Sequence, residues 1–164
     1  MARLVLIAPD KFKGTLTAPD AARAIATGWH QARPHDDLVL QPISDGGDGF
    51  GTLMAETLHG EIISCDAANA AGNPNTAAYW LTPDHTAIIE SASVIGLAML
   101  EPSQRAPFEN DSTGLGQIIL HATANGAKRL VIGIGGSATN DGGFGMTRAL
   151  GWEFLDSANK PITQ

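Results

Sequence analysis

The stretch Leu130-Val-Ile-Gly-Ile-Gly-Gly-Ser-Ala-Thr-Asn-Asp-Gly-Gly143 sets the pattern for the whole chain. It begins with an apolar run, which is typical of a buried strand, and then breaks into a glycine-rich turn. Ser137, Thr139, Asn140 and Asp141 follow before a second pair of glycines. Glycines let a backbone approach a ligand closely and turn its N–H groups toward an anion. The stretch therefore predicts a strand followed by a binding loop.

The N-terminal part of the chain shows the same order twice. Residues 3–8 and 38–43 are apolar, and polar loops follow them at residues 10–15 and 44–49. A helix is expected after each loop, the first with Thr17 as N-cap and Asp20 at the capping-box position, the second ending at Gly60. This alternation predicts an α/β fold, with a Rossmann-like or flavodoxin-like parallel sheet and helices on both faces.

The middle of the chain has a different pattern. Residues 61–66, 76–81 and 86–90 are three expected strands separated by turn residues, with no helix between them. They predict a β-rich antiparallel segment belonging to a second subdomain. A helix around residues 115–122, a strand at 129–133, a helix at 143–150 and a strand at 152–156 are expected next.

These patterns predict three parts along the chain. Residues 1–60 are expected to form an α/β, Rossmann-like part, and residues 61–100 the segment of the β-rich subdomain. Residues 101–164 are expected to form a second α/β part, which contains the glycine loop and is cut short at its C-terminal end, because the last expected strand has no crossover to cover it.

Composition narrows the class of protein. The chain has 164 residues, 43% of them hydrophobic, and a net charge of −7, as in a folded globular protein rather than a disordered one. Its ten Lys and Arg residues are scattered, so nucleic-acid binding is not expected. No apolar run suits a membrane span, and the single Cys65 excludes an internal disulfide. A cytoplasmic protein is expected.

The three polar loops are expected to line one crevice, because ligands of open α/β sheets bind beyond the carboxyl ends of the strands. The first loop contains Asp10 and Lys13, the second Asp45 and Asp48, and the third the polar residues of the opening stretch. Taken singly, each has an ordinary explanation: solvated charges for the first loop, and a helix N-cap for Asp48. Asp45, at the strand end, is the better candidate for chemistry. Residues 69–74 are expected to be a hairpin turn, and the five histidines surface residues.

A dinucleotide-binding oxidoreductase domain is the first alternative. Gly133-Ile-Gly-Gly-Ser-Ala138 satisfies the pattern G-x-G-x-x-A after a strand, and Asp156 ends the next expected strand. In that fold the helix begins directly after the glycines, whereas residues 139–143 intervene here. The match is therefore the weaker interpretation. The sequence contains neither a Walker A motif nor the protein-kinase signature set.

Four stretches in the same order resemble the N-terminal part of bacterial glycerate kinases of the glycerate 2-kinase type. Lys11 and Asp48 stand where Ser and Glu are common in that family, and its members are more than twice as long, with a glycine-rich acidic segment that this chain lacks. The stretches are Ala8-Pro-Asp-Lys-Phe-Lys-Gly-Thr-Leu16, Pro42-Ile-Ser-Asp-Gly-Gly-Asp-Gly49, Ile89-Glu-Ser-Ala-Ser-Val-Ile-Gly-Leu97, and Ser112-Thr-Gly-Leu-Gly116 continued by Ile132-Gly-Ile-Gly-Gly-Ser-Ala-Thr-Asn-Asp-Gly-Gly143.

The resemblance implies a two-domain kinase, with its site in the cleft, that uses ATP and Mg²⁺ to phosphorylate D-glycerate in glycerate, glyoxylate or aldarate catabolism. It implies 2-phosphoglycerate as the product, with 3-phosphoglycerate as the less favoured one. A homodimer is left open, and neither a nucleic acid nor a membrane partner is expected. A truncated, catalytically inactive piece of such an enzyme is the second alternative.

Roles for the candidate residues follow from this resemblance. Lys13 would be the cation for the glycerate carboxylate or the transferred phosphate. Asp45 and Asp141 would be the general base and the Mg²⁺ contact, in an order that the sequence leaves open. The side chains and backbone expected to hold glycerate hydroxyls or phosphate oxygens belong to Asp10, Gly135, Gly136, Ser137, Thr139 and Asn140.

Overall fold

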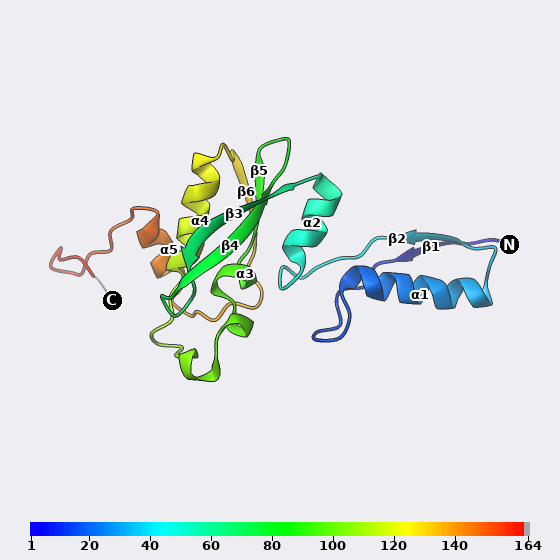
Figure 1. Cartoon of the computed structure of the whole chain (residues 1–164), viewed down its shortest axis with the longest axis horizontal. Coiled ribbons are helices and arrows are strands. Elements are labelled where there is room, and N and C mark those ends of the chain that lie inside the picture. Colours follow the sequence, from blue (N-terminus) through cyan, green and yellow to red (C-terminus); the bar gives the residue numbers. More distant parts are fainter. Residues whose placement is uncertain (163–164) are drawn as a thin grey trace. The chain divides into compact units, whose positions relative to one another are not determined.

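The computed structural model describes residues 1–162 and consists of two compact units, residues 1–45 and residues 46–164. In Figure 1 the first unit is drawn in blue and cyan, and the second runs from cyan to red. Each unit combines a parallel strand pair with helices, which is the expected α/β class. Among the described residues, no helix is both long and apolar enough to cross a membrane.

The first unit is a strand–helix–strand arrangement. Strand β1 (Leu4–Ile7) and strand β2 (Asp37–Leu40) form a parallel two-stranded sheet, and helix α1 (Ala18–Ala32) connects them. The expected cap of α1 is confirmed: the Thr17 hydroxyl accepts a hydrogen bond from the Asp20 N–H at 3.2 Å and donates one to the Asp20 carboxylate at 2.5 Å. Strand β2 ends at Leu40, three residues before the predicted end.

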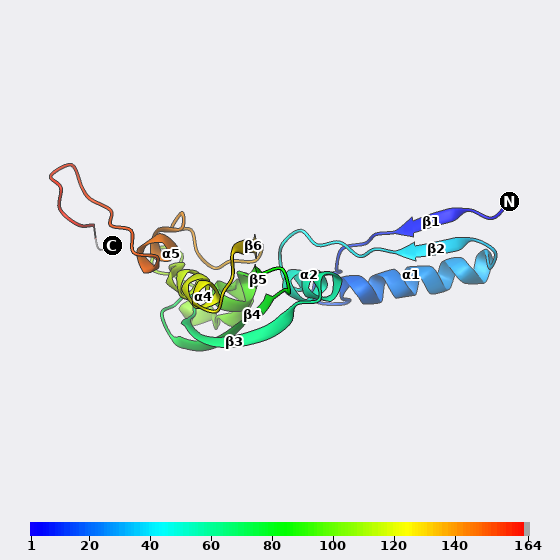
Figure 2. The same ribbon diagram turned by 90° about the horizontal axis from the view of Figure 1, so that it is seen from above.

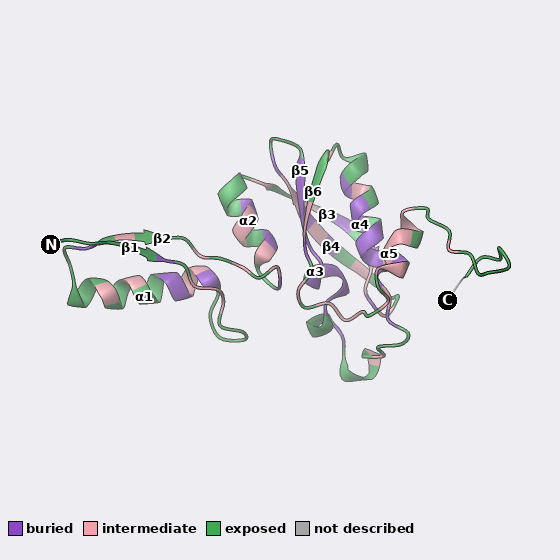
Figure 3. Cartoon of the chain, turned by 180° about the vertical axis from the view of Figure 1, so that it is seen from behind, coloured by how far each residue is buried: buried purple, intermediate pink, exposed green. Residues whose placement is uncertain are grey.

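Burial differs between the two sides of β1. Ile7 is only 5% exposed, whereas Leu4 and Leu6 are 76% and 64% exposed. Side chains alternate across a strand, so Leu4 and Leu6 share one face and that face is open in this chain. Figure 3 shows β1 and β2 largely in the colour of exposed residues, while buried residues concentrate in the second unit.

The second unit contains a four-stranded sheet with strand order β3-β4-β5-β6. Strands β3 (Glu61–Ala68), β4 (Pro74–Leu81) and β5 (Thr86–Glu90) pair antiparallel, which confirms the expected meander. Strand β6 (Arg129–Gly133) then pairs parallel with β5. One sheet thus contains both the expected β-rich segment and the strand that leads into the glycine loop.

Helices cover both faces of this sheet. Helix α4 (Thr113–Ala124) packs on β3 and β4, as Figures 1 and 2 show, and its Ile118 lies in a core with Tyr79 and Ile89, all fully buried. Helix α2 (Phe50–Leu58) packs on β4 and β5. It does so through Gly51, where an added Cβ would lie 2.0 Å from the Trp80 ring.

Short helical segments complete the second unit. They follow β5, where the chain turns back past the glycine loop, and β6, where the loop ends. The segments are α3 (Ala92–Ile95), the 3₁₀ turns η1 (Leu97–Met99) and η2 (Pro102–Gln104), and α5 (Phe144–Ala149).

The predicted strand at residues 152–156 is wrong. Only an isolated bridge between Leu155 and Pro161 forms there, and Trp152 is 69% exposed. A strand needs a neighbour for its N–H and C=O groups, and in residues 1–162 no strand pairs with this segment. The apolar pattern alone therefore overestimated regular structure at this point.

Candidate functional site

The second and third polar loops meet backbone to backbone. The Gly135 N–H donates to the Gly46 carbonyl at 3.0 Å. A Cβ added at Gly135 would lie 2.7 Å from Gly47 Cα, and one at Gly133 would lie 2.6 Å from the Gly46 oxygen. A side chain at Gly133 or Gly135 would collide with the second loop, so the glycines permit this close approach. These two loops are therefore adjacent, as predicted, while their forming one binding site stays a prediction.

The third loop also lies along the segment that follows β5. The Ala138 N–H donates to the Ile95 carbonyl at 2.8 Å, and the Leu97 N–H donates to the Gly136 carbonyl at 2.9 Å. The hydroxyls of Ser91 and Ser137 are 3.2 Å apart. The Ser137 side chain therefore contacts Ser91, a residue that sequence reasoning did not single out.

Thr139 and Asn140 lie in the same loop, and no hydrogen bond within residues 1–162 involves either side chain. Thr139 is half-buried and Asn140 is exposed. Asp48 contributes a carboxylate nearby, because a Cβ added at Gly136 would lie 3.4 Å from Asp48 Oδ1. The loop thus presents polar side chains beside glycines whose positions leave no space for a Cβ or require a positive φ.

Asp48 does not cap helix α2, which corrects one sequence interpretation. The N-cap is Gly49, in the left-handed region with φ of 88°, and it has no side chain to accept a hydrogen bond. The carboxylate of Glu90 takes that place: its Oε2 accepts from the Gly49 N–H at 3.0 Å and from the Gly51 N–H at 2.9 Å. Glu90 was missed as a functional candidate; its signal was a charged residue at the end of an apolar strand.

Asp141 is engaged in four hydrogen bonds. Its Oδ2 accepts from the Ser112 N–H at 3.0 Å, the Ser112 hydroxyl at 2.7 Å and the Gly145 N–H at 2.9 Å, and its Oδ1 accepts from the Gly143 N–H at 3.1 Å. Burial alone would raise the pKa of Asp141, but the donors at Gly145, Ser112 and Gly143 outweigh it and keep that pKa below the usual value. The carboxylate joins the starts of α4 and α5.

Asp10, Lys13 and Asp45 belong to the first unit. Asp10 is half-buried and accepts from the Lys11 N–H at 2.6 Å, while Lys13 is exposed in a tight turn. The cation beside Asp45 is Lys11, whose Nζ lies 3.9 Å from Asp45 Oδ1. The Asp45 side chain is 70% exposed and the Lys11 side chain 20%. That the first loop joins the other two stays a prediction.

The geometry does not suit a dinucleotide-binding loop. After Ala138 the chain continues in turns, and α5 begins only at Phe144. In a Rossmann site the helix N-terminus directly follows the glycines and faces the pyrophosphate. Here the N–H groups of Gly143 and Gly145 already donate to Asp141, and Asp156 ends no strand.

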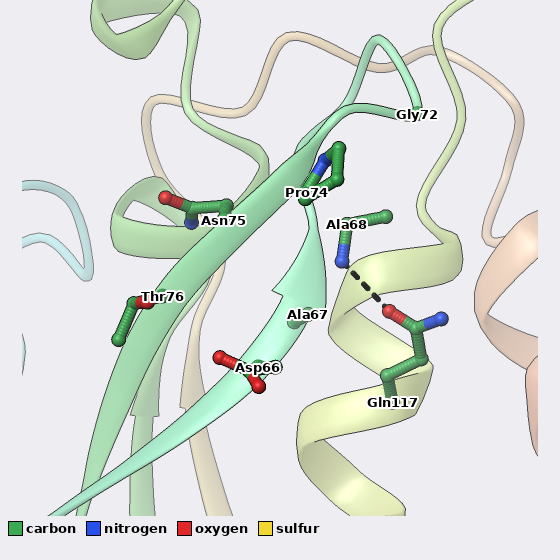
Figure 4. Close-up of a pocket in the computed structure, with 8 residues that line it drawn as sticks. All are labelled: Asp66, Ala67, Ala68, Gly72, Pro74, Asn75, Thr76 and Gln117. Carbon is green, nitrogen blue, oxygen red and sulfur yellow. Dashed lines mark hydrogen bonds between the residues drawn. The ribbon is translucent and has the colours of Figure 1, made fainter.

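A groove of about 660 Å³ lies along strands β3 and β4, beside the turn that joins them (Figure 4). The Ala68 N–H donates to Gln117 Oε1 there at 2.7 Å, and Asn75 points away from Gln117. In the turn itself, Asn69 Oδ1 accepts from the N–H groups of Ala71 and Asn73. Residues 69–74 are thus the predicted hairpin connection, and the groove contains none of the candidate residues.

Known proteins similar to this chain agree with the motifs. The family described as the glycerate kinase family matches residues 5–164. A glycerate kinase from Haemophilus influenzae is 42% identical over 158 residues, and the glycerate 2-kinase from Escherichia coli is 37% identical over 159 residues. Each match covers 96% of this chain, which spans 42% of the length of these two curated relatives.

A solved structure gives the same answer for the fold. The crystal structure of a protein named as glycerate kinase 2 from Salmonella typhimurium superimposes with a TM-score of 0.79 at 39% identity. The match covers all of this chain and 44% of that one. With the family match over nearly the whole sequence, the chain belongs to the glycerate kinase family.

Proposed function

We propose that this chain forms the glycerate- and phosphate-binding part of an ATP-dependent kinase that converts D-glycerate to 2-phosphoglycerate. The observation that carries the proposal is the contact of two glycine loops, with Ser137, Thr139 and Asn140 beside it. The names of the related proteins support the substrate. D-Glycerate offers one carboxylate and two hydroxyls, which match N–H, hydroxyl and amide donors.

Phosphoryl transfer asks little covalent chemistry of a protein. Catalysis rests on positioning the acceptor hydroxyl and on neutralising charge at the transferred group. In this proposal Gly135, Gly136 and Ser137 bind oxygens of glycerate or phosphate, and Thr139 and Asn140 orient the substrate hydroxyls. Asp10 and Lys13 contribute polar and positive groups from the first loop.

The structure supports different tasks for the two candidate carboxylates. Asp141 Oδ2 already accepts three hydrogen bonds, and its lowered pKa makes it a poor proton acceptor. The Asp45 side chain is 70% exposed beside Lys11, so an acceptor hydroxyl can approach its carboxylate from solvent. We therefore assign the general base to Asp45, and to Asp141 the task of holding the loop in shape, with any contact to the metal left to its Oδ1.

A magnesium ion fits this donor set. Residues 1–162 contain no cluster of three or more metal-ligating side chains, but Mg²⁺ bound with a nucleotide needs only one or two carboxylates beside the phosphates. Asp141 Oδ1, which accepts one hydrogen bond, is the oxygen assigned to such a contact, and an ion there would neutralise phosphate charge. The nucleotide itself is expected to be ATP, as the name of a kinase family implies.

Binding and turnover test the proposal separately. D-Glycerate added to the ¹⁵N-labelled chain is expected to shift the amide resonances of residues 133–140, whereas glycerol, which lacks the carboxylate, is expected to leave them in place. With ATP and Mg²⁺ present, ADP release measures turnover and ³¹P–¹H coupling in the product shows which hydroxyl carries the phosphate. Binding without ADP release would identify a part that binds but does not catalyse; enhanced NADH fluorescence would favour the oxidoreductase.

Replacing Asp45 tests its role. In the complete enzyme, Asp45→Asn is expected to lower kcat by about 100-fold or more, because an amide cannot accept the proton of the acceptor hydroxyl. The matched control is Asp37→Asn, an exposed aspartate at the start of β2 in the same unit, which is expected to keep wild-type kcat. A kcat near wild type for Asp45→Asn would remove Asp45 from the chemistry.

A further inference from the structure

Glu90 is a buried carboxylate in an apolar setting. It is the last residue of β5, a strand buried along its whole length, and it is 8% exposed. It shares a sheet face with Ile88, which pairs with Trp80 under helix α2. A charge removed from water to this extent is costly unless hydrogen bonds replace its hydration, so its partners define its task.

Both partners found for Glu90 are backbone amides at the start of α2. Oε2 accepts from Gly49, the N-cap, at 3.0 Å and from Gly51, inside the first turn, at 2.9 Å. The first N–H groups of a helix have no acceptor within it, and Gly49 offers no side chain as a cap. A negative charge also suits the positive end of the helix dipole. Glu90 thus supplies, from 41 residues away, a cap that the local sequence lacks.

Glu90 also stands where the two glycine loops join. Gly49 ends the second loop, whose Gly46 carbonyl accepts from the Gly135 N–H of the third loop. On the other side, the residue after Glu90 donates its N–H to the Gly133 carbonyl at 2.9 Å, and its hydroxyl faces Ser137. One side chain therefore lies between the start of α2 and both loops.

We propose that Glu90 is a positioning residue that holds the start of α2 and, through it, keeps the Gly46–Gly49 segment against the Gly133–Gly136 loop. We call this set of contacts the Glu90 clamp, and its effect on substrate binding rests on the proposed function. Glu90 acts through the loops and not on the substrate, since its Oε2 faces two backbone amides and the residue is nearly buried. The same contacts keep the N-terminus of α2 from binding an anion.

Amide hydrogen exchange on the full chain tests the clamp without any ligand. Glu90→Ala removes the acceptor, Glu90→Gln keeps the shape and loses the charge, and Glu56→Gln is the control on an exposed position of the same helix. In Glu90→Ala the amides of Gly49, Gly51 and Gly135 are expected to exchange at least about tenfold faster, with a smaller change in Glu90→Gln. The amides of β5 and β6 are expected to keep wild-type rates in all three variants.

The positions of the changes decide the result. Faster exchange at Gly49 and Gly51 with an unchanged rate at Gly135 would overturn the coupling between the loops, and unchanged rates at all three would overturn the clamp itself. If Glu90→Ala does not fold, the isosteric Glu90→Gln carries the test, with acceleration confined to the same three amides as the supporting result.

A titration with D-glycerate separates this inference from the proposed function. Affinity measured by the amide shifts of residues 133–140 is expected to fall about tenfold in Glu90→Ala and to stay unchanged in Glu56→Gln, one hydrogen-bonded contact being worth about that factor. Equal affinity in Glu90→Ala and wild type would overturn the positioning role. Failure of the wild-type chain to bind D-glycerate would count against the proposed function, while the exchange rates still decide the task of Glu90.

Discussion

Single carboxylates determine much of the local geometry in this chain. Glu90 and Asp141 each accept backbone N–H groups at the start of a helix, α2 and α5, and Asp36 does comparable work in the first unit. Hydrogen bonds to an ionised carboxylate favour its charged form, and they hold the pKa of Asp141 and of Asp36 below the usual value. The carboxylates at these three positions thus serve the fold through their contacts with the backbone.

Asp36 makes the stability of the first unit depend on pH. Its side chain is 2% exposed and accepts from Arg33 Nε at 2.7 Å, Trp29 Nε1 at 3.1 Å and the Arg3 N–H at 3.1 Å. The Arg33 guanidinium foremost, with the Trp29 and Arg3 donors, holds the pKa of Asp36 well below its usual value of 3.8. A carboxylate with a lowered folded pKa adds stability above pH 3.8, and the gain is lost as the pH falls through the folded pKa.

Asp36→Asn is therefore expected to destabilise the first unit at pH 7 and to weaken the loss of stability between pH 4 and about 2. Urea unfolding followed by the indole N–H resonance of Trp29 in the ¹⁵N-labelled chain, at several pH values, measures both effects. Asp37→Asn, at the exposed neighbouring position, is the control. An acid response identical in wild type and Asp36→Asn would show that the Arg33 pair does not control it.

At the scale of elements, strand and helix positions follow from local pattern. Residues 86–90 and 129–133 are predicted with the observed bounds of β5 and β6, because both stretches stand out as apolar runs. Helix α1 was marked by its Thr17 cap. The strand predicted at residues 152–156 does not form. A strand depends on pairing with a distant segment, and a five-residue pattern contains no information about that partner.

Two helical glycines have opposite expected responses to alanine. At Gly51 in α2 the new Cβ would lie 2.0 Å from Trp80, and such overpacking is expected to cost about 1–3 kcal/mol in the free energy of unfolding. At Gly28 in α1 no atom lies within 4 Å of an added Cβ, and alanine is expected to stabilise the helix by about 0.5–1 kcal/mol. Denaturant unfolding measures both; a stabilised Gly51→Ala would show that Trp80 moves aside without cost.

At the scale of the whole molecule, the two units differ in how much core they have. Residues 1–45 contain a two-stranded sheet with Leu4 and Leu6 exposed, whereas the second unit has the buried cluster around Tyr79 and Ile118. Residues 1–45 lie close to the size of about 40 residues below which one hydrophobic core usually needs other support. The chain also spans 42% of the length of the Haemophilus influenzae relative. The strand with the exposed Leu4 and Leu6 is thus matched to a segment of a longer protein.

Hydrogen exchange is expected to resolve the two units. Amides of β1 and β2 are expected to exchange at least about tenfold faster than those of β5 and β6, because local opening of a small, open-faced sheet costs less free energy than opening the main core. Spectra of the intact chain at several pH values provide the rates. Equal protection of the two sheets would mean that they unfold as one cooperative body.

The sequence by itself determined the strand-and-loop order, the cap of α1, the antiparallel meander, the placement of glycines between strands and helices, and the resemblance to the family. These features depend on neighbours a few residues apart, so local pattern encodes them. Only the tertiary structure decided that Lys11 faces Asp45, that Asp141 joins two helix starts and that Glu90 caps α2. The last two contacts join residues 29 and 39 positions apart, which meet only after strands pair and helices pack on the sheet.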